Sequence, residues 1–360
     1  MINLLKKFYT KFLDPKPRSI NKRENEIERF EKFCKKRDFS ISGDYSLILS
    51  LGSLNKDKIF YIIRRSPGAG MFSNILYVLN HIKIANHYKF IPIVDMKNFV
   101  SIYNDHVNIS GYENSWEYYF EKISNYKLSE VYKSNKVIIS SNNFYSSFNY
   151  HLDDDEFKKL FDENIKFKKN IKRYVDKFEK KYFDNKKILG VHFRGTSYKT
   201  SAGHPLVPTK NQMFSLISKI LKKDNLEKIF LVTEEENHLQ FCKKKFNKKL
   251  IYLKSSFRSN KNDAFKKYVR HKHRYKLGRE IIAETLLLSK CDSFLFVDSN
   301  VSSAVIRINS NKSQKRYKID NGLNSKNKIL ALIFWHLKKF LPSFLGGFKK
   351  EPGLIFLKNQ

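Results

Sequence analysis

Two patterns of apolar residues alternate along the second half of the chain. Short, nearly continuous apolar runs predict buried strands at 188–193, 228–233, 250–254 and 293–298. Segments with apolar residues at helical spacing predict helices at 208–222, 234–246, 277–290 and 301–308. Because strands that alternate with helices form parallel sheets, this half of the chain predicts a doubly wound α/β domain.

The first half of the chain predicts a smaller unit of the same kind. An apolar strand at 58–63 leads into the glycine turn of "RRSPGAG", a helix begins at Met71, and a second strand follows at 89–95. We predict a helical segment at 1–57, α/β domains at 58–156 and 186–325, a helical linker between them at 157–185, and a tail at 326–360. Two such domains joined by a helical linker predict a ligand cleft between them.

The chain is strongly basic. Its 360 residues include 70 lysines and arginines against 35 acids, and the net charge of +35 implies an anionic partner such as nucleic acid, a lipid surface or a phosphorylated substrate. Three widely spaced cysteines without a CxxC motif fit a reducing compartment. The start of the chain lacks the continuous apolar core of a secretory signal, and no run reaches the ~18 apolar residues of a spanning helix. We therefore expect a cytoplasmic location.

The strand within "KKILGVHFRGTSYKT" ends in two polar side chains that share a face. Leu189, Val191 and Phe193 lie on one face, and His192 and Arg194 lie on the other. The carboxyl end of a strand is where parallel sheets bind ligands. Arginine offers a rigid fork of donors for phosphate, and histidine can hydrogen-bond a base or a hydroxyl. The alternative is structural, with the arginine paired locally and the histidine satisfied in the core.

Two further turns have the features of anion sites. In "FVDSNVSSAVIRI" a strand ends and Ser299 and Asn300 begin a helix, whose N-terminus attracts phosphate, although an ordinary N-cap explains them equally well. In "PGAGMFS", Gly68 and Gly70 nearly match a dinucleotide-binding fingerprint, and Asp95 ends the next strand where a ribose-binding acid would fall. A nicotinamide cofactor is therefore an alternative.

The acidic runs "HLDDDEF" and "TEEEN" directly precede predicted helices. Negative side chains stabilise a helix N-terminus, and neither run has the histidine or cysteine neighbours of a transition-metal site. We interpret both runs as helix starts and predict no metal site.

The tail contains "KILALIFWHLKKFLPSFLGGFKK", which combines apolar residues with lysines and has no acids. Its longest apolar run is too short to span a bilayer, but an interfacial helix needs only an apolar face and cations. We expect the tail to be amphipathic and to dock on an anionic membrane surface. Packing against the protein's own core is the alternative.

Taken in order from about residue 59 to 310, these segments resemble the α-1,6-fucosyltransferases and the rhizobial nodulation fucosyltransferase, which are GDP-fucose-dependent enzymes of the GT-B fold. The matching segments are "SPGAGMFSNILYVLNHIKIANHYKFIPIVD", "NSWEYYFEKIS", "GVHFRGTSYK", "FLVTEEENHLQFCKKKF" and "REIIAETLLLSKCDSFLFVDSNVSS". The resemblance implies a GT-B-like α/β fold with two Rossmann-like domains facing a cleft. The first would be the acceptor-side domain, and the second would bind the nucleotide sugar.

The resemblance also implies roles for single residues. Arg194 matches the arginine that neutralises the donor β-phosphate, and His192 matches the histidine that helps to hold the guanine. Glu284 falls where an acid recognises the guanine edge, although its pattern alone predicts a solvated helix residue. The implied donor-binding residues are His192, Arg194, Glu284, Ser299, Asn300, Gly68 and Gly70.

Two positions depart from the family. Ser197 stands where the family has an aspartate after Arg-x-Thr, and Gly195 replaces a second basic residue. The segment has no clear counterpart to the family's catalytic carboxylate. His204, a side chain that titrates near neutrality, is the candidate base beside Arg194 as the catalytic cation.

We therefore expect a metal-independent glycosyltransferase, without a cofactor, that moves fucose or a related sugar from a GDP-sugar to a glycan or lipid-linked acceptor. Its setting would be bacterial surface polysaccharide or glycolipid synthesis, at the inner face of the cell membrane. The alternatives are a basic nucleic-acid-binding protein and a nicotinamide-dependent enzyme. The diffuse charge and the lack of a recognisable RNA or DNA module argue against the nucleic-acid alternative.

Overall fold

The computed structural model describes residues 48–65, 68–140, 152–195, 198–261, 263–309 and 313–357. The helical segment predicted at 1–57 lies largely outside the described residues, as does Ser197. The chain forms two compact units. The first takes the chain up to Lys169 together with Phe265–Arg279, and the second comprises Asn170–Ala264 and Glu280–Gln360.

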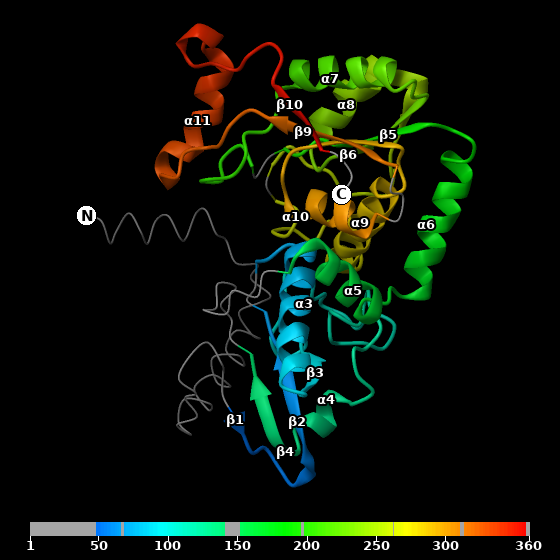
Figure 1. Cartoon of the computed structure of the whole chain (residues 1–360), viewed down its shortest axis with the longest axis vertical. Coiled ribbons are helices and arrows are strands. Elements are labelled where there is room, and N and C mark those ends of the chain that lie inside the picture. The colour runs from blue at the N-terminus through cyan, green and yellow to red at the C-terminus, as the bar shows by residue number, and fades with distance from the viewer. Residues whose placement is uncertain are drawn as a thin grey trace. The chain divides into compact units, whose positions relative to one another are not determined.

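The first unit is built on a four-stranded sheet. Its elements are β1 (Ile48–Leu49), β2 (Leu54–Ile63), α3 (Met71–His87), β3 (Ile91–Val94), α4 (Leu128–Val131), β4 (Ser134–Ile139) and α5 (Asp154–Asn164). The strand order is β1-β4-β2-β3, with β2 parallel to β3 and β4, and β1 antiparallel to β4. Helix α3 connects β2 to β3, as predicted, and lies along the sheet (Figure 1).

The starts of α3 and α5 follow from their local sequences. Gly68 has a φ of +99°, a left-handed conformation that favours glycine, and Gly70 is the N-cap of α3. Asp153 caps α5 in a reciprocal pair of hydrogen bonds with Glu156. The interpretation of the first acidic run as a helix start is therefore confirmed.

The second unit is built on a six-stranded sheet with the order β10-β9-β8-β5-β6-β7. Its elements are α6 (Lys169–Tyr182), β5 (Ile188–His192), α7 (Lys210–Lys223), β6 (Lys228–Val232), α8 (Glu236–Phe246), β7 (Leu250–Ile251), α9 (His273–Leu288), β8 (Ser293–Phe296), α10 (Asn300–Ile308), β9 (Lys315–Asp320), α11 (Lys328–Phe340) and β10 (Gly353–Leu357), with short 3-10 helices at Asn247–Lys249 and Ser343–Leu345. All neighbouring strands are parallel except β9 and β10. Helix α9 begins in the first unit and ends in the second.

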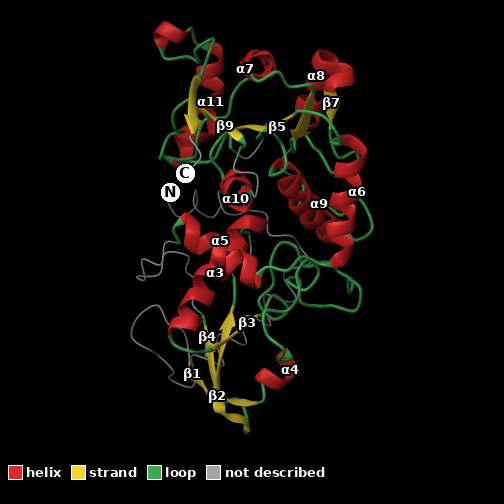
Figure 2. Cartoon of the chain, turned by 45° about the vertical axis from the view of Figure 1, so that its right-hand side comes forward, coloured by secondary structure: helices red, strands yellow, loops and turns green. Residues whose placement is uncertain are grey.

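The strands of this sheet place alternate side chains in two cores. Leu189 and Leu231 belong to the core under α7 and α8, whereas Phe230 and Val232 belong to the core under α6, α9 and α10. Figure 2 shows these two sets of helices on opposite sides of the strands. Burial on both faces explains why the strands are nearly continuous apolar runs.

The predicted mixed α/β fold with parallel sheets is confirmed. Two details differ from the sequence-based expectation. The helical linker predicted at 157–185 contains parts of two helices, α5 and α6, and the strand predicted at 250–254 covers only Leu250–Ile251. Strands β9 and β10 were not predicted. The ligand cleft stays a prediction.

Candidate active site

Three parallel strands of the second unit end at one edge of their sheet. β5 pairs with β6 on one side and with β8 on the other. The chain continues from β5 to β6 and β7 on one side and then crosses to β8, so β5 lies at the switch point where open α/β sheets bind ligands. The segments 193–195, 233–235 and 297–300 follow these strands and lie at this edge.

His192 is the last residue of β5 and is 1% exposed. Its Nδ1 has no hydrogen-bond partner among the described residues. Burial, followed by the charge of Arg194, lowers the pKa of His192 to about 4, so the imidazole is neutral at pH 7. Because buried polar atoms nearly always have partners, this nitrogen does not fit the alternative of a histidine satisfied in the core, and His192 stays a candidate for ligand binding.

Arg194 forms the local ion pair that the structural alternative predicts. Its Nη1 lies 3.3 Å from Oε1 of Glu234, and its guanidinium lies 4.7 Å from the centre of the Tyr198 ring. The same oxygen of Glu234 accepts a 3.0 Å hydrogen bond from the N–H of Gly195. Burial is the largest single effect and would raise the pKa of Glu234, but the charge of Arg194, the interaction with His192 and the backbone hydrogen bonds, including that from Gly195, together lower the pKa. The guanidinium is thereby fixed at the carboxyl end of β5.

Gly195 packs directly against a second carboxylate. A Cβ atom at this position would lie 2.5 Å from Oε1 of Glu235. That carboxylate is itself held in place, by Lys199 Nζ at 2.6 Å and by His238 Nε2 at 3.0 Å. Any side chain at position 195 would therefore clash with the Glu235 carboxylate, which fits the presence of a glycine there.

His204 and Arg194 both contact the ring of Tyr198. The Tyr198 ring contacts both the Arg194 guanidinium and the His204 ring, the latter at a centroid distance of 4.7 Å. His204 is exposed. Partial burial, followed by the charge of Arg194, lowers its pKa, so the imidazole is neutral at pH 7. A neutral, accessible imidazole has the protonation state that a general base requires.

Glu284 lies on α9 and is 6% exposed, so the expectation of a solvated helix residue is wrong. Ser256 Oγ donates a 2.6 Å hydrogen bond to its Oε1, and Arg258 Nη2 lies 3.8 Å from the same oxygen. Burial raises the pKa of Glu284 to about 7, against the opposing charge of Arg258. Buried carboxylates that titrate near neutrality are common in functional sites.

Ser299 is the N-cap of α10, which agrees with the ordinary capping interpretation. Its Oγ accepts a 3.1 Å hydrogen bond from the N–H of Ser302, whose own Oγ accepts one of 2.8 Å from the N–H of Ser299. Asn300 is the first helical residue and is exposed. The positive end of the α10 dipole thus lies at the sheet edge that carries Arg194.

Gly68 and Gly70 lie in the first unit, whereas the other candidate residues lie in the second. Asp95 does not have the environment of a ribose ligand. It is fully buried, and its carboxylate accepts hydrogen bonds from the N–H groups of Lys97 and Asn98 and from the hydroxyl of Tyr132. This use of Asp95 within the unit argues against the nicotinamide alternative.

Sequence reasoning missed Glu234 and Glu235 as members of the site. The run "TEEEN" does lie at a helix start, since Glu235 is the N-cap of α8 and Glu236 is in its first turn, but Glu234 and Glu235 also pair with Arg194, Lys199 and His238. A signal was present: both residues come shortly after the strand at 228–232, with Thr233 between, and this strand is parallel to β5. Their side chains therefore had to lie near the end of β5.

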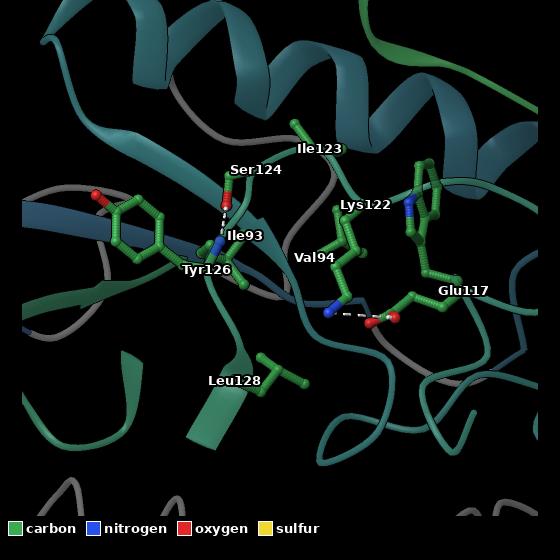
Figure 3. Close-up of a pocket in the computed structure, with 9 residues that line it drawn as sticks. Ile93, Val94, Glu117, Lys122, Ile123, Ser124, Tyr126 and Leu128 are labelled. Atoms are coloured by element: carbon green, nitrogen blue, oxygen red, sulfur yellow. Dashed lines mark hydrogen bonds and ion pairs between the residues drawn. The ribbon is translucent and has the colours of Figure 1, made fainter. Parts of the chain in front are cut away.

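The described residues contain no group of three or more His, Cys, Asp or Glu side chains that could hold a metal ion. The first unit has a small pocket that none of the predicted site residues lines (Figure 3). It lies beside Ile93 and Val94 of β3, and Lys122 and Glu117 face each other within it at 4.0 Å.

No protein-family model and no curated protein sequence matches the chain. Among solved structures, the fucosyltransferase NodZ from Bradyrhizobium matches with a TM-score of 0.50 and 12% identity, over 84% of this chain and 100% of that chain. NodZ alpha-1,6-fucosyltransferase soaked with GDP-fucose gives 0.49 and 12%, over 74% and 98%. A variant of Arabidopsis thaliana FUT1 in complex with GDP gives 0.41 and 11%, over 84% and 78%. The chain therefore has the fold of the Bradyrhizobium fucosyltransferase, and the resemblance seen in the sequence is confirmed.

Proposed function

We propose that the protein is a glycosyltransferase that uses a GDP-sugar donor and needs no metal. The observation that carries this proposal is the pair His192 and Arg194 at the carboxyl end of β5, the switch point of the second sheet. NodZ, whose fold the chain shares, has been crystallised with GDP and soaked with GDP-fucose. Fucose or a related GDP-activated sugar is accordingly the proposed donor group.

The donor would occupy the edge formed by the ends of β5, β6 and β8. Arg194 and the N-terminus of α10, at Ser299 and Asn300, would hold the diphosphate through cationic and N–H groups. Glu284, as a carboxylate, would accept hydrogen bonds from the guanine edge, and His192 Nδ1 would bond to the same nucleotide. Gly68 and Gly70 are proposed as further donor-binding positions of the first unit.

The transfer step needs a stabilised leaving group and an activated acceptor. A hydroxyl oxygen of the acceptor bonds to the anomeric carbon, the bond from that carbon to the diphosphate oxygen breaks, and GDP leaves with the electron pair. Arg194 stabilises the charge that develops on the departing diphosphate, which lowers the barrier more than it strengthens ground-state binding. His204 receives the proton of the acceptor hydroxyl.

The proposed acceptor is a glycan or lipid-linked glycan of a bacterial surface polysaccharide or glycolipid. This part of the proposal rests on the sequence resemblance and on the basic, apolar tail, since a membrane-facing enzyme suits a lipid-linked substrate.

Titration calorimetry of the full chain tests the proposal. We expect wild type to bind GDP and to bind UDP and CMP more weakly. In a separate activity assay, Arg194→Ala and Arg194→Lys should lose GDP-sugar turnover by several orders of magnitude. The lysine variant fails as well because lysine keeps the charge but not the two-pronged geometry of arginine. Lys222→Ala, at an exposed position of α7, is the control for loss of one positive charge.

Three outcomes would overturn the proposal. A folded Arg194→Ala protein with wild-type turnover would remove Arg194 from the site. Binding of NADH without binding of GDP would favour the nicotinamide-dependent enzyme. Binding of random RNA with a steep salt dependence, again without GDP, would favour the nucleic-acid-binding protein.

A further inference from the structure

Helix α11 packs against the rest of the second unit through one side. Ala331 and Trp335 are its buried residues. The indole Nε1 of Trp335 donates a 2.8 Å hydrogen bond to the carbonyl of Val207, and its ring packs against Leu206 and Val207. These contacts fix which side of the helix faces away from the sheet.

The chain folds back directly after α11. The N–H of Phe348 donates a 2.9 Å hydrogen bond to the carbonyl of Lys338, and Lys338 Nζ donates one of 2.7 Å to the carbonyl of Gly346. Figure 1 shows this return as the orange-to-red segment beside α11. Residues 341–345 therefore extend the surface of the helix rather than trail away from it.

The outer side of this structure is apolar and exposed. Half of the large apolar side chains that are exposed in the described part of the chain fall within 329–345. We call this set the apolar face: Ile329, Leu330, Ile333, Leu337, Phe340, Leu341, Phe344 and Leu345. Phe340 and Phe344 are 79% and 84% exposed. A cluster of this size on a protein surface marks an interaction site.

The stretch of chain that carries the apolar face is rich in lysines and has no acids up to residue 350. Residues 326–350 contain six lysines, at positions 326, 328, 338, 339, 349 and 350, and neither Asp nor Glu. A partner that complements this surface therefore combines negatively charged groups with an apolar region that the exposed side chains can enter. A second copy of this chain does not fit, because it would bring the same lysines and a net charge of +35 to the contact.

We propose that the apolar face docks on an anionic lipid bilayer, with the aromatic and aliphatic side chains among the acyl chains and the lysines at the headgroups. No helix in the described ranges is long and apolar enough to cross a membrane, so the mode is interfacial. The proposal concerns where the protein acts and does not depend on the GDP-sugar reaction.

Co-sedimentation of the full chain with lipid vesicles tests the proposal. We expect binding to vesicles of phosphatidylcholine with phosphatidylglycerol, weaker binding at high salt, and little binding to phosphatidylcholine alone. The double variant Phe340→Ser/Phe344→Ser should lower the partition coefficient on the order of tenfold or more, because two large apolar side chains no longer enter the membrane.

Two matched controls separate the apolar face from general surface properties. Leu54→Ser/Val269→Ser removes two exposed apolar side chains elsewhere, and Lys244→Gln/Lys249→Gln removes two exposed lysines elsewhere. Both controls should keep most of the vesicle binding. All variants should keep the circular dichroism and GDP affinity of wild type, because the substituted side chains are exposed and outside the candidate active site.

The alternatives predict different results. If Phe340→Ser/Phe344→Ser binds vesicles as fully as wild type, the lysines act alone and the proposal fails. If wild type sediments as a dimer and this variant as a monomer that still binds vesicles, a second copy covers the face. If the full chain does not bind anionic vesicles, the proposal fails.

Discussion

Glu284 combines deep burial with a pKa of about 7, against the ordinary value of 4.5, and burial is the main cause. Between these two pH values the folded protein holds a proton that the unfolded chain has released. The stability that this proton contributes is complete below about pH 4.5 and is lost as pH rises through about 7. A shift of this size corresponds to roughly 3 kcal/mol in the free energy of unfolding.

We predict that Glu284→Gln removes this part of the pH dependence. Denaturant unfolding at several pH values between 4.5 and 8 should show a shallower decline in the free energy of unfolding for the variant than for wild type. Glu163→Gln, at an exposed carboxylate of α5, should behave as wild type. Parallel pH curves for wild type and Glu284→Gln would show that Glu284 does not titrate near neutrality.

The proposed role of Glu284 makes a second prediction, for ligand binding. If its carboxylate accepts hydrogen bonds from guanine, GDP binding requires the ionised form and should tighten as pH rises through about 7. Calorimetry in two buffers should then show proton release on binding. In Glu284→Gln the affinity should fall about tenfold or more at pH 8, since a charge-assisted hydrogen bond is lost. An unchanged affinity would leave Glu284 with a structural role only.

The sequence was sufficient for some residues of the site and insufficient for others. The shared face of His192 and Arg194 followed from the two-residue period of a strand. The burial of Glu284 could not be predicted in this way, because the groups that contact Glu280 and Glu284 come from the loop at 256–258, more than twenty residues earlier in the chain. A pattern read as apolar or polar cannot detect such pairs.

At the scale of elements, helix α9 contains a glycine, Gly278, where a residue distant in the sequence leaves no room for a side chain. A Cβ at Gly278 would lie 2.3 Å from the hydroxyl oxygen of Tyr119. That hydroxyl also donates to the carbonyl of Tyr275 at 3.2 Å, so the tyrosine is held against the helix. Glycine in mid-helix ordinarily costs up to about 1 kcal/mol relative to alanine, but here it permits the close approach.

We therefore predict that Gly278→Ala destabilises the protein by about 1–3 kcal/mol, the opposite sign from an ordinary helical Gly→Ala change. The midpoint of denaturant unfolding measures the effect. Lys276→Ala, in the same helix and only partly buried, controls for helix propensity. A gain in stability for Gly278→Ala would mean that Tyr119 moves aside at little cost.

The elements that the sequence predicted are those with strong local patterns. Buried parallel strands are continuous apolar runs, and α5 and α7 begin at side chains that cap them. Strand β9 is different, because buried Tyr317 and Ile319 alternate with basic residues. Its antiparallel partner β10 lies more than thirty residues further along the chain, as the pairing of Asp320 with Gly353 shows. Pairing over such a separation leaves no local signal.

At the scale of the whole molecule, we predict metal-independent activity. In the proposed reaction Arg194 and the N-terminus of α10 supply the positive charge that a metal supplies in other transferases. Turnover should therefore be the same, within about twofold, in EDTA and in Mg²⁺ or Mn²⁺. Activity that disappears in EDTA and returns with either ion would contradict this prediction. GDP binding measured in EDTA then shows whether the metal acts on donor binding or on the transfer step.

The close packing of Gly195 against Glu235 couples two positions that are forty residues apart in the chain. A side chain at position 195 should destabilise the protein while the carboxylate of Glu235 is present. Replacing Glu235 in turn removes the ion-pair contacts of Lys199 and His238. In a double-mutant cycle, Gly195→Ala and Glu235→Ala should together cost less stability than the sum of their separate effects. A larger side chain at position 195 is therefore expected to be tolerated only together with a smaller residue at position 235.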